Sequence, residues 1–186
     1  MKQAMELERA AISRRESQGS ALARIRTPAA ESEWLDATVR RFAQYLEADG
    51  LHAALGYLNS RTRFRFTGAY RFAPPLLCSI GVFDRENPAL ILSAEVPMET
   101  TYCSIVAAER GSFVVDDSGH DPRVVTHPSR DIYAAYCGVP LRDAAGEPFG
   151  TLCHFDPRPR IGSADQTVVL DRVAPLVASY SLGLAN

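Results

Sequence analysis

The stretch YAAYCGVPLRDAAGEPFGTLCHFD, residues 133–156, decides how this chain folds. It consists of two apolar runs that flank the polar segment Arg142–Pro148. Within that segment, Gly146 can adopt the positive φ angle that a tight turn often requires. The stretch therefore predicts a β-hairpin, and the other predicted strands are placed by reference to it.

Upstream of the hairpin, the pattern of side chains changes from helical to alternating at about residue 63. Phe64, Phe66, Gly68 and Tyr70 point to one face, and the residues between them point to the other, which predicts a strand. After Pro74-Pro75, we expect further strands over residues 76–83, 89–96 and 113–115. A polar loop, residues 116–130, follows the last of these.

Helices are predicted on both sides of these strands. One covers residues 2–16. A second begins after the break at Pro28, where Ser32 could cap it, and another follows Gly50. A short helix is expected over residues 102–110, and a last helix is capped by Ser163 and bent at Pro175. We expect an α+β domain over residues 31–186, with helices packed on an antiparallel sheet, and a helical extension over residues 1–30.

Composition restricts the class of protein. The formal net charge is −2, whereas a dedicated nucleic-acid surface needs a basic excess, so no nucleic-acid partner is expected. No apolar run approaches the roughly 20 residues that cross a bilayer, so we expect no membrane partner and a cytoplasmic protein. The four cysteines are widely spaced in apolar surroundings, which is typical of reduced thiols in a reducing compartment.

Several ordered motifs together resemble one family. The hairpin carries YCGVPLRD and FGTLCHFD, and upstream stand VPM before Tyr102-Cys103, then FVVDD, DPR and His127-Pro128. This set resembles GAF domains over about residues 34–182. The resemblance implies a central antiparallel sheet with terminal helices on one face. It also implies a ligand pocket on the other face, roofed by the short helix and the loop.

The resemblance implies a module that senses a small molecule or regulates a partner in signal transduction. Its partners would be an unidentified small molecule and a signalling protein. A homodimer through the terminal helices is also expected. The sequence identifies no cofactor or ligand, and a fold of this kind hosts many functions.

Known variants of the family can be compared residue by residue. Bilin sensors usually carry a Cys-His pair in the roof helix, but Ser104 follows Cys103, and His120 and His127 are expected to be exposed on the loop. The signature of cyclic-nucleotide GAF domains is not reproduced. Cys153 and His154 are neighbours on a strand and face opposite sides, so no metal site is expected.

Two alternatives to a sensor remain open. One is a thiol enzyme similar to free methionine-R-sulfoxide reductase, since Cys103 resembles one of that family's cysteines in placement. The loop in which those enzymes keep their reactive cysteine has none here, so catalysis is not expected. The other is a dimerisation module that binds no ligand.

Pocket residues are predicted from strand alternation, from the roof helix and from the acidic residues of the loop. Aromatic and thiol side chains suit a modest apolar ligand, although they also fill ordinary cores. A buried carboxylate could bind a ligand amine. The candidates are Tyr70, Cys78, Tyr102, Cys103, Asp116, Tyr136 and Cys153.

Overall fold

The computed structural model describes residues 28–91 and 94–183. The chain forms two compact units, Met1–Trp34 and Leu35–Asn186, and the fold below is that of the second. The helix predicted over residues 2–16 lies outside the described residues, and the boundary predicted between residues 30 and 31 stays a prediction.

The first described helix is α2 (Pro28–Ser60), which is interrupted at Gly50. The predicted break at Gly50 is confirmed, since its φ of 80° is not helical. The cap predicted at Ser32 is wrong because the helix already begins at Pro28, whose fixed φ suits a first helical position. Leu35 and Phe42 are buried before the break, and Leu51, Leu55 and Leu58 are buried after it.

A six-stranded sheet forms the centre of the fold, with the order β3-β2-β1-β6-β5-β4. Every neighbouring pair of strands is antiparallel. The strands are β1 (Phe66–Ala73), β2 (Leu76–Asp84), β3 (Glu95–Pro97), β4 (Phe113–Val115), β5 (Ala135–Arg142) and β6 (Pro148–Asp156). The predicted hairpin is confirmed as β5 and β6, and Gly146 in its turn has a φ of 83°.

Two details of the predicted strands are wrong. Of the described residues in the strand expected over residues 89–96, those of β3, which begins at Glu95, pair with β2, whereas Asn87 and Leu90 are held in turns by local backbone hydrogen bonds. Phe64 precedes β1 and does not share the face of Tyr70. Its ring stacks on His154, with 5.6 Å between ring centroids, on the face of the sheet that carries the helices.

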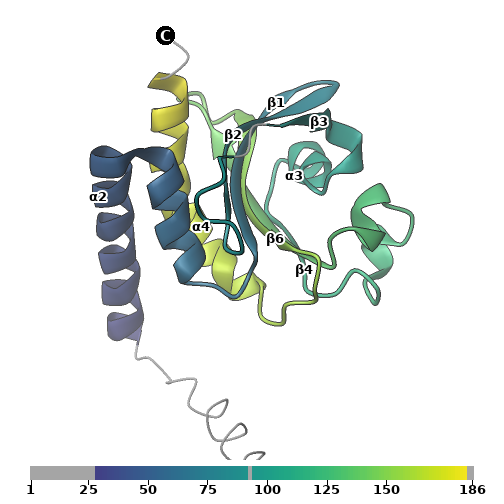
Figure 1. Cartoon of the computed structure of the whole chain (residues 1–186), viewed down its shortest axis with the longest axis horizontal. Helices are drawn as coiled ribbons and strands as arrows, with labels where there is room; N and C mark the ends of the chain where they lie inside the picture. The colour runs from purple at the N-terminus through teal and green to yellow at the C-terminus, as the bar shows by residue number, and fades with distance from the viewer. Residues whose placement is uncertain (1–27, 92–93, 184–186) are drawn as a thin grey trace, which may run out of the picture. The chain divides into compact units, whose positions relative to one another are not determined.

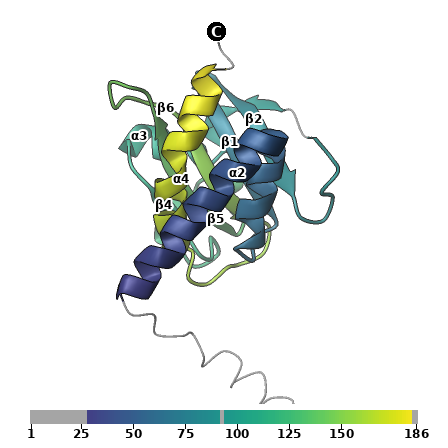
Figure 2. The same cartoon turned by 90° about the vertical axis from the view of Figure 1, so that its left-hand side faces the viewer.

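Helices cover one face of the sheet. α4 (Ala164–Gly183) packs against β5 and β6. Pro175 lies inside it, and the bend predicted there stays a prediction. The part of α2 after Gly50 packs against β2, where Gly81 faces Leu51 and Leu55. Figures 1 and 2 show α2 and α4 side by side, and an ion pair joins Asp36 to Arg172.

The short helix α3 (Cys103–Glu109) and the segment 116–134 lie on the other face (Figure 1). A short 3₁₀ turn precedes α3 at Met98–Thr100, and two more lie within the segment 116–134, at Pro122–Val124 and Pro128–Asp131. The predicted α+β fold, with its antiparallel sheet between two different layers, is thus confirmed. The layer around α3 is thin and loop-rich, and it encloses a cavity.

Candidate functional site

A cavity of about 350 Å³ lies between the sheet and α3. Its walls come from β1, β2, β5 and β6, and its roof comes from the start of α3 and the segment 129–133. None of the described residues that line it has an acidic or basic side chain of the Asp, Glu, Lys, Arg or His type. They are Phe66, Tyr70, Leu77, Val82, Ala94, Val96, Thr100, Thr101, Tyr102, Cys103, Ser129, Ile132, Tyr133, Tyr136, Cys153 and Phe155.

Two glycines shape the floor of the cavity. Gly68 on β1 and Gly138 on β5 both pair with Cys153, which lies between them on β6. A Cβ atom at Gly68 would lie 2.6 Å from the ring of Tyr70, and one at Gly138 would lie 2.6 Å from Cζ of Tyr136. Because only glycine leaves this room, the two tyrosine rings lie over the sheet on either side of Cys153.

Two cysteine thiols line the cavity beside these tyrosines. Cys103, the first residue of α3, and Cys153 are both free and buried, and both line the cavity. The hydroxyl of Tyr136 also donates to Sγ of Cys103 over 3.5 Å. Burial opposes ionisation of Cys103, but hydrogen bonds from Cys153, Tyr136 and Thr101 outweigh it and lower its pKa from the ordinary value. Burial raises the pKa of Cys153 well above its ordinary value, so that thiol stays protonated.

The roof is held by polar contacts and a ring stack. Tyr102 stacks on His127, with 4.7 Å between ring centroids, and its hydroxyl donates to the carbonyl of Tyr133 over 3.3 Å. The hydroxyl of Ser129 donates to the carbonyl of Thr100 over 2.7 Å. His127 is therefore partly buried and not exposed as predicted, whereas His120 is 88% exposed beside Asp117.

The tyrosines give the cavity neutral hydrogen-bonding groups. Burial raises the pKa of Tyr70 and Tyr136 well above the ordinary value, and it also raises the pKa of Tyr102 and Tyr133. All four hydroxyls therefore stay protonated near neutral pH. The site can donate to or accept from a neutral ligand, but it offers no charge to pair with an ion.

Five of the seven predicted pocket residues line this cavity: Tyr70, Tyr102, Cys103, Tyr136 and Cys153. Their role in binding a ligand stays a prediction. The structure also brings Phe66 and Phe155 to the cavity, where their rings stack with 4.8 Å between centroids. Strand alternation with Tyr70 and Cys153 is the signal that could have found both.

Cys78 and Asp116 are corrections to the predicted site. Cys78 pairs with Arg71 in the register of β1 and β2, so it faces away from the cavity, and its thiol donates to Glu95 over 3.8 Å. Asp116 does not reach the cavity because its carboxylate accepts hydrogen bonds from the backbone N–H groups of Gly162 and Ser163 before α4. Both side chains serve local structure.

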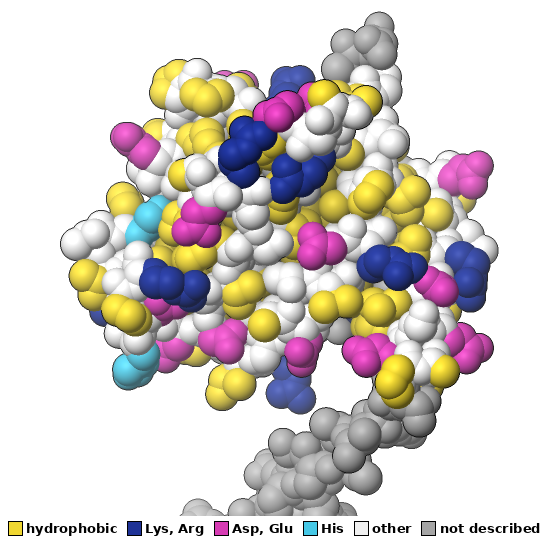
Figure 3. Space-filling view, turned by 180° about the vertical axis from the view of Figure 1, so that it is seen from behind, with side chains coloured by type: hydrophobic (Ala, Val, Ile, Leu, Met, Phe, Trp, Pro, Cys, Tyr) yellow, Lys and Arg dark blue, Asp and Glu magenta, His cyan; other side chains and the backbone are white. Residues whose placement is uncertain are grey.

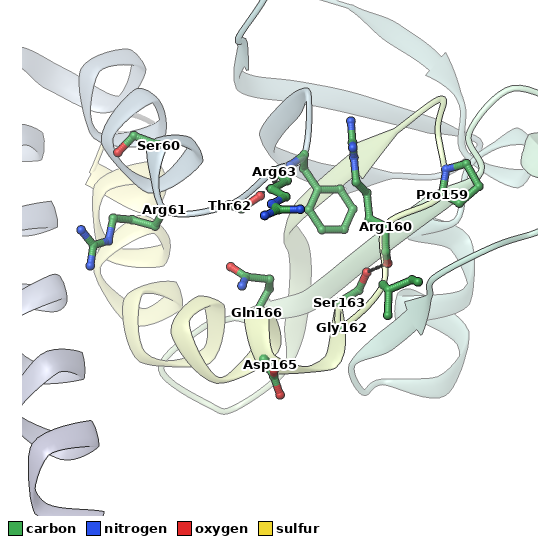
Figure 4. A pocket seen from close by; sticks show the side chains of 12 residues that line it. Ser60, Arg61, Thr62, Arg63, Pro159, Arg160, Gly162, Ser163, Asp165 and Gln166 are labelled. Carbon is green, nitrogen blue, oxygen red and sulfur yellow. Dashed lines mark hydrogen bonds between the residues drawn. The ribbon is translucent and has the colours of Figure 1, made fainter. Parts of the chain in front are cut away.

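A larger hollow of about 580 Å³ lies between residues 60–64 and 159–166. Arg61, Arg63 and Arg160 line it, which suggests a site for an anion. Figure 4 shows, however, that Arg61 and Arg160 point away from one another, and Arg160 already pairs with the buried Asp156 at 2.6 Å. The arginines therefore do not converge on one point, and the cavity beneath α3 is the better candidate site.

Other classes of site can be compared with the described residues. Over residues 28–91 and 94–183, no group of three or more His, Cys, Asp and Glu is placed to hold a metal ion. None of the helices in that part of the chain has the length and apolarity to cross a membrane. On the side of the molecule shown in Figure 3, acidic and basic side chains are interspersed among hydrophobic ones.

Comparison with known proteins adds to this geometry. The sequence matches the GAF domain family over residues 1–180. No curated protein matches it significantly. Among solved structures, the GAF domain of a phosphoenolpyruvate-protein phosphotransferase from Acinetobacter is similar with a TM-score of 0.63. It is 14% identical, and the match covers 81% of this chain and 93% of that chain.

Two further structures are similar at the same 14% identity. A free methionine-R-sulfoxide reductase from Neisseria meningitidis, in complex with its substrate, has a TM-score of 0.61 over 81% of this chain and 90% of its own. The chromophore-binding domain of a bacteriophytochrome from R. palustris has a TM-score of 0.62 over 82% of this chain and 61% of its own. At this identity these likenesses show the fold alone. With the family match over nearly its whole length, the chain belongs to the GAF domain family, a family of sensor and regulatory domains.

Proposed function

We propose that this chain is a sensor or regulatory module that binds a small, uncharged and largely apolar molecule with an aromatic ring in the cavity beneath α3. One observation carries the proposal. Among the described residues, all 16 that line the cavity lack an acidic or basic side chain of the Asp, Glu, Lys, Arg or His type, and most of them are apolar or aromatic.

Neutral walls select against charged ligands. A charged group that enters an apolar site loses its hydration and must find a partner, which is costly when none is present. Free amino acids and cyclic nucleotides carry such groups. A neutral ring that stacks on Phe66, Phe155 or Tyr133 loses little hydration and gains contact with aromatic faces.

The volume also suits a small ligand. Ligand pockets commonly measure about 300–1,000 Å³, and the cavity of about 350 Å³ lies near the lower limit. The hydroxyls of Tyr70 and Tyr133 stay protonated because burial raises their pKa, so each is available to a hydroxyl, amide or ring N–H of the ligand.

The experiment compares neutral aromatic molecules with anionic analogues that carry the same ring. Indole and 2-naphthol are titrated against the full chain by calorimetry, beside indole-3-acetate and 2-naphthoate. We expect the neutral member of each pair to bind and to raise the melting temperature, because a ligand that binds only the folded state stabilises it. Binding by the anions alone, or by none of the four, would contradict the proposal.

A pair of matched variants places the binding site. Val96→Trp sets a large ring at the wall of the cavity and should weaken binding of indole, whereas Val125→Trp adds the same ring at a side chain that is 62% exposed outside the cavity. Equal loss of binding in both variants would place the site elsewhere.

A second candidate is a thiol reductase, and it is favoured by the lowered pKa of Cys103, whose thiol lines the cavity. Free methionine sulfoxide carries both an ammonium and a carboxylate, and no lining residue offers either group a charged partner. We therefore expect no turnover of methionine sulfoxide in a coupled assay. Turnover that Cys103→Ser abolishes would establish the enzyme and replace the sensor.

The proposed module acts on a signalling partner in the cytoplasm, as a homodimer through α2 and α4. The position of these helices, side by side on one face of the sheet, supports the dimer (Figure 2). Light scattering on the purified chain tests it, and a monomer in dilute solution would contradict it.

A further inference from the structure

We propose that Cys103 and Cys153 form a reversible disulfide bond across the floor of the cavity when a small hydroperoxide enters it, and that this bond excludes the ligand. The formation of the bond stands on the geometry of the two thiols. Only its effect on the ligand rests on the proposed function.

The sheet leaves room for a second sulfur atom beside the thiol of Cys153. On both sides of Cys153 the neighbouring strands carry glycine, at Gly68 and Gly138, so its two strand partners place no side chain beside its thiol. The rings of Tyr70 and Tyr136 lie over these glycines. Cys103 covers this space from above, at the start of α3.

The two thiols face the same cavity, beside the ring of Tyr136. Cys103 and Cys153 both line the cavity, and the S–H of Cys153 donates to the carbonyl oxygen of Gly68 over 3.6 Å. The hydroxyl of Tyr136 donates to the sulfur of Cys103 over 3.5 Å, and the ring of Tyr136 lies over Gly138, the strand partner of Cys153. Side-chain rotation within the cavity can therefore bring the two sulfurs together, with no exchange of partners between distant elements.

The other two cysteines cannot take part. Cys137 lies next to Gly138 on β5, so it faces the helices, and burial raises the pKa of its thiol strongly. Cys78 also faces away from the cavity and is bonded to Glu95. The sheet separates both from the pair, although Cys78 is the more exposed thiol.

The chemistry proceeds in two balanced steps. Cys103 sulfur attacks the distal oxygen of the hydroperoxide. An S–O bond forms, the O–O bond breaks, and the thiol proton leaves with the alkoxide or hydroxide as an alcohol or water. The sulfur of Cys153 then attacks the sulfenic acid sulfur of Cys103. An S–S bond forms, the S–O bond breaks, and the leaving hydroxide takes the Cys153 proton as water. The two thiols lose two electrons in total to the hydroperoxide, and a dithiol reductant restores them.

The disulfide changes the site in two ways. It bridges the space between the roof and the floor of the cavity, and it turns the sulfur of Cys103 away from the hydroxyl of Tyr136. Oxidation therefore lowers the affinity for a ligand that needs the whole cavity, and a bound ligand shields the thiols from the hydroperoxide.

The test uses the full chain and hydrogen peroxide. We expect the intact mass to fall by two hydrogen atoms, peptide mapping to link Cys103 to Cys153, and dithiothreitol to reverse the link. Cys153→Ala should leave Cys103 as a sulfenic acid that dimedone traps, and Cys103→Ser should leave Cys153 reduced. A Cys78→Ser, Cys137→Ser double variant should retain the link.

Three results would each overturn the proposal. They are a disulfide that involves Cys78 or Cys137, disulfides between chains only, and oxidation of Cys78 while Cys103 and Cys153 both stay free. The peptide map of the unsubstituted chain shows which cysteines are linked even where a variant fails to fold.

Indole titrated into the reduced and the oxidised chain separates the disulfide from its effect on the ligand. If the reduced chain does not bind indole, the proposed function fails but the disulfide stands. Equal affinity in both states overturns the regulation alone.

Discussion

At the scale of single residues, small side chains decide the shape of the site. Tyr70 and Tyr136 lie over glycines, and Cys153 lies between the two rings. The sequence predicted Tyr70, Tyr136 and Cys153 for the cavity because alternation along a strand places every second residue on the same face. It did not predict that Gly68 and Gly138 make room for the tyrosine rings, because the contact between a ring and a glycine depends on the three-dimensional structure.

Gly138→Ala tests this arrangement. The added methyl would overlap the ring of Tyr136, which is buried and has little room to move. We expect the free energy of unfolding to fall by about 1–3 kcal/mol, the range for an overpacked core. Urea denaturation measures it. Gly183→Ala is the matched control, since a Cβ atom there meets nothing within 4 Å. Equal effects in the two variants would show that the ring does not depend on the glycine.

The error at Cys78 also belongs to this scale. Residues 76–83 form an almost continuous apolar run, which has no alternation from which to assign faces. Because the register of β1 and β2 shifts between Ala69 and Tyr70, counting residues along the two strands does not give the strand partner of Cys78. Only the observed pairing of Cys78 with Arg71 shows which face it occupies.

At the scale of elements, the residue that follows β4, Asp116, fixes the start of α4. Ser163 was predicted as the cap, but its hydroxyl donates to the carbonyl of Arg160 at 2.8 Å. Asp116 accepts from the N–H groups of Gly162 and Ser163, and its carbonyl accepts from Arg160 at 2.8 Å. Local sequence patterns could not predict this cap, because the partners are more than 40 residues apart.

Asp116→Ala should weaken the start of α4. Burial opposes ionisation of this carboxyl, but hydrogen bonds from Ser163 and Gly162 lower its pKa, so a carboxylate accepts the bonds. Losing such a cap costs about 0.5–2 kcal/mol of stability. We expect faster hydrogen exchange in the first turn of α4 and a lower urea midpoint. Asp117→Ala, at the neighbouring exposed aspartate, should change neither measurably.

At the scale of the whole molecule, a buried polar network joins the end of α2 to the sheet. Arg85 donates to Oδ1 of Asn59 at 3.0 Å, and Nδ2 of Asn59 donates to Oγ1 of Thr67 at 2.9 Å. Thr67 in turn lies 2.7 Å from Nδ1 of His154. The order of elements and the two layers were predictable from periodicity and from the family resemblance. This network was not, because each member is an ordinary polar residue in sequence.

His154 makes the stability of the molecule depend on pH. Burial, with a smaller contribution from Arg85, lowers its pKa from 6.5 to about 3. Below pH 6.5 the unfolded chain binds a proton at this histidine that the folded chain does not, so stability falls with pH and is lost progressively down to about pH 3. We expect a slope of about 1.4 kcal/mol per pH unit between roughly pH 6 and pH 5, above the range in which most carboxylates titrate.

Urea denaturation across that interval measures the slope. His154→Leu removes the titrating group, so the variant should show a markedly flatter dependence, whatever its stability at neutral pH. A variant with the same slope as the unsubstituted chain would assign the dependence to other groups.

The alternation of β6 has one more consequence. Cys153 and His154 share a peptide bond, yet the first borders the cavity and the second touches Thr67 under the helices. A backbone shift at Cys153, caused by a bound ligand or by oxidation of its sulfur, would also move His154, which lies on the helix side of the sheet. The cavity layer and the helix layer are therefore coupled through a single peptide bond of β6.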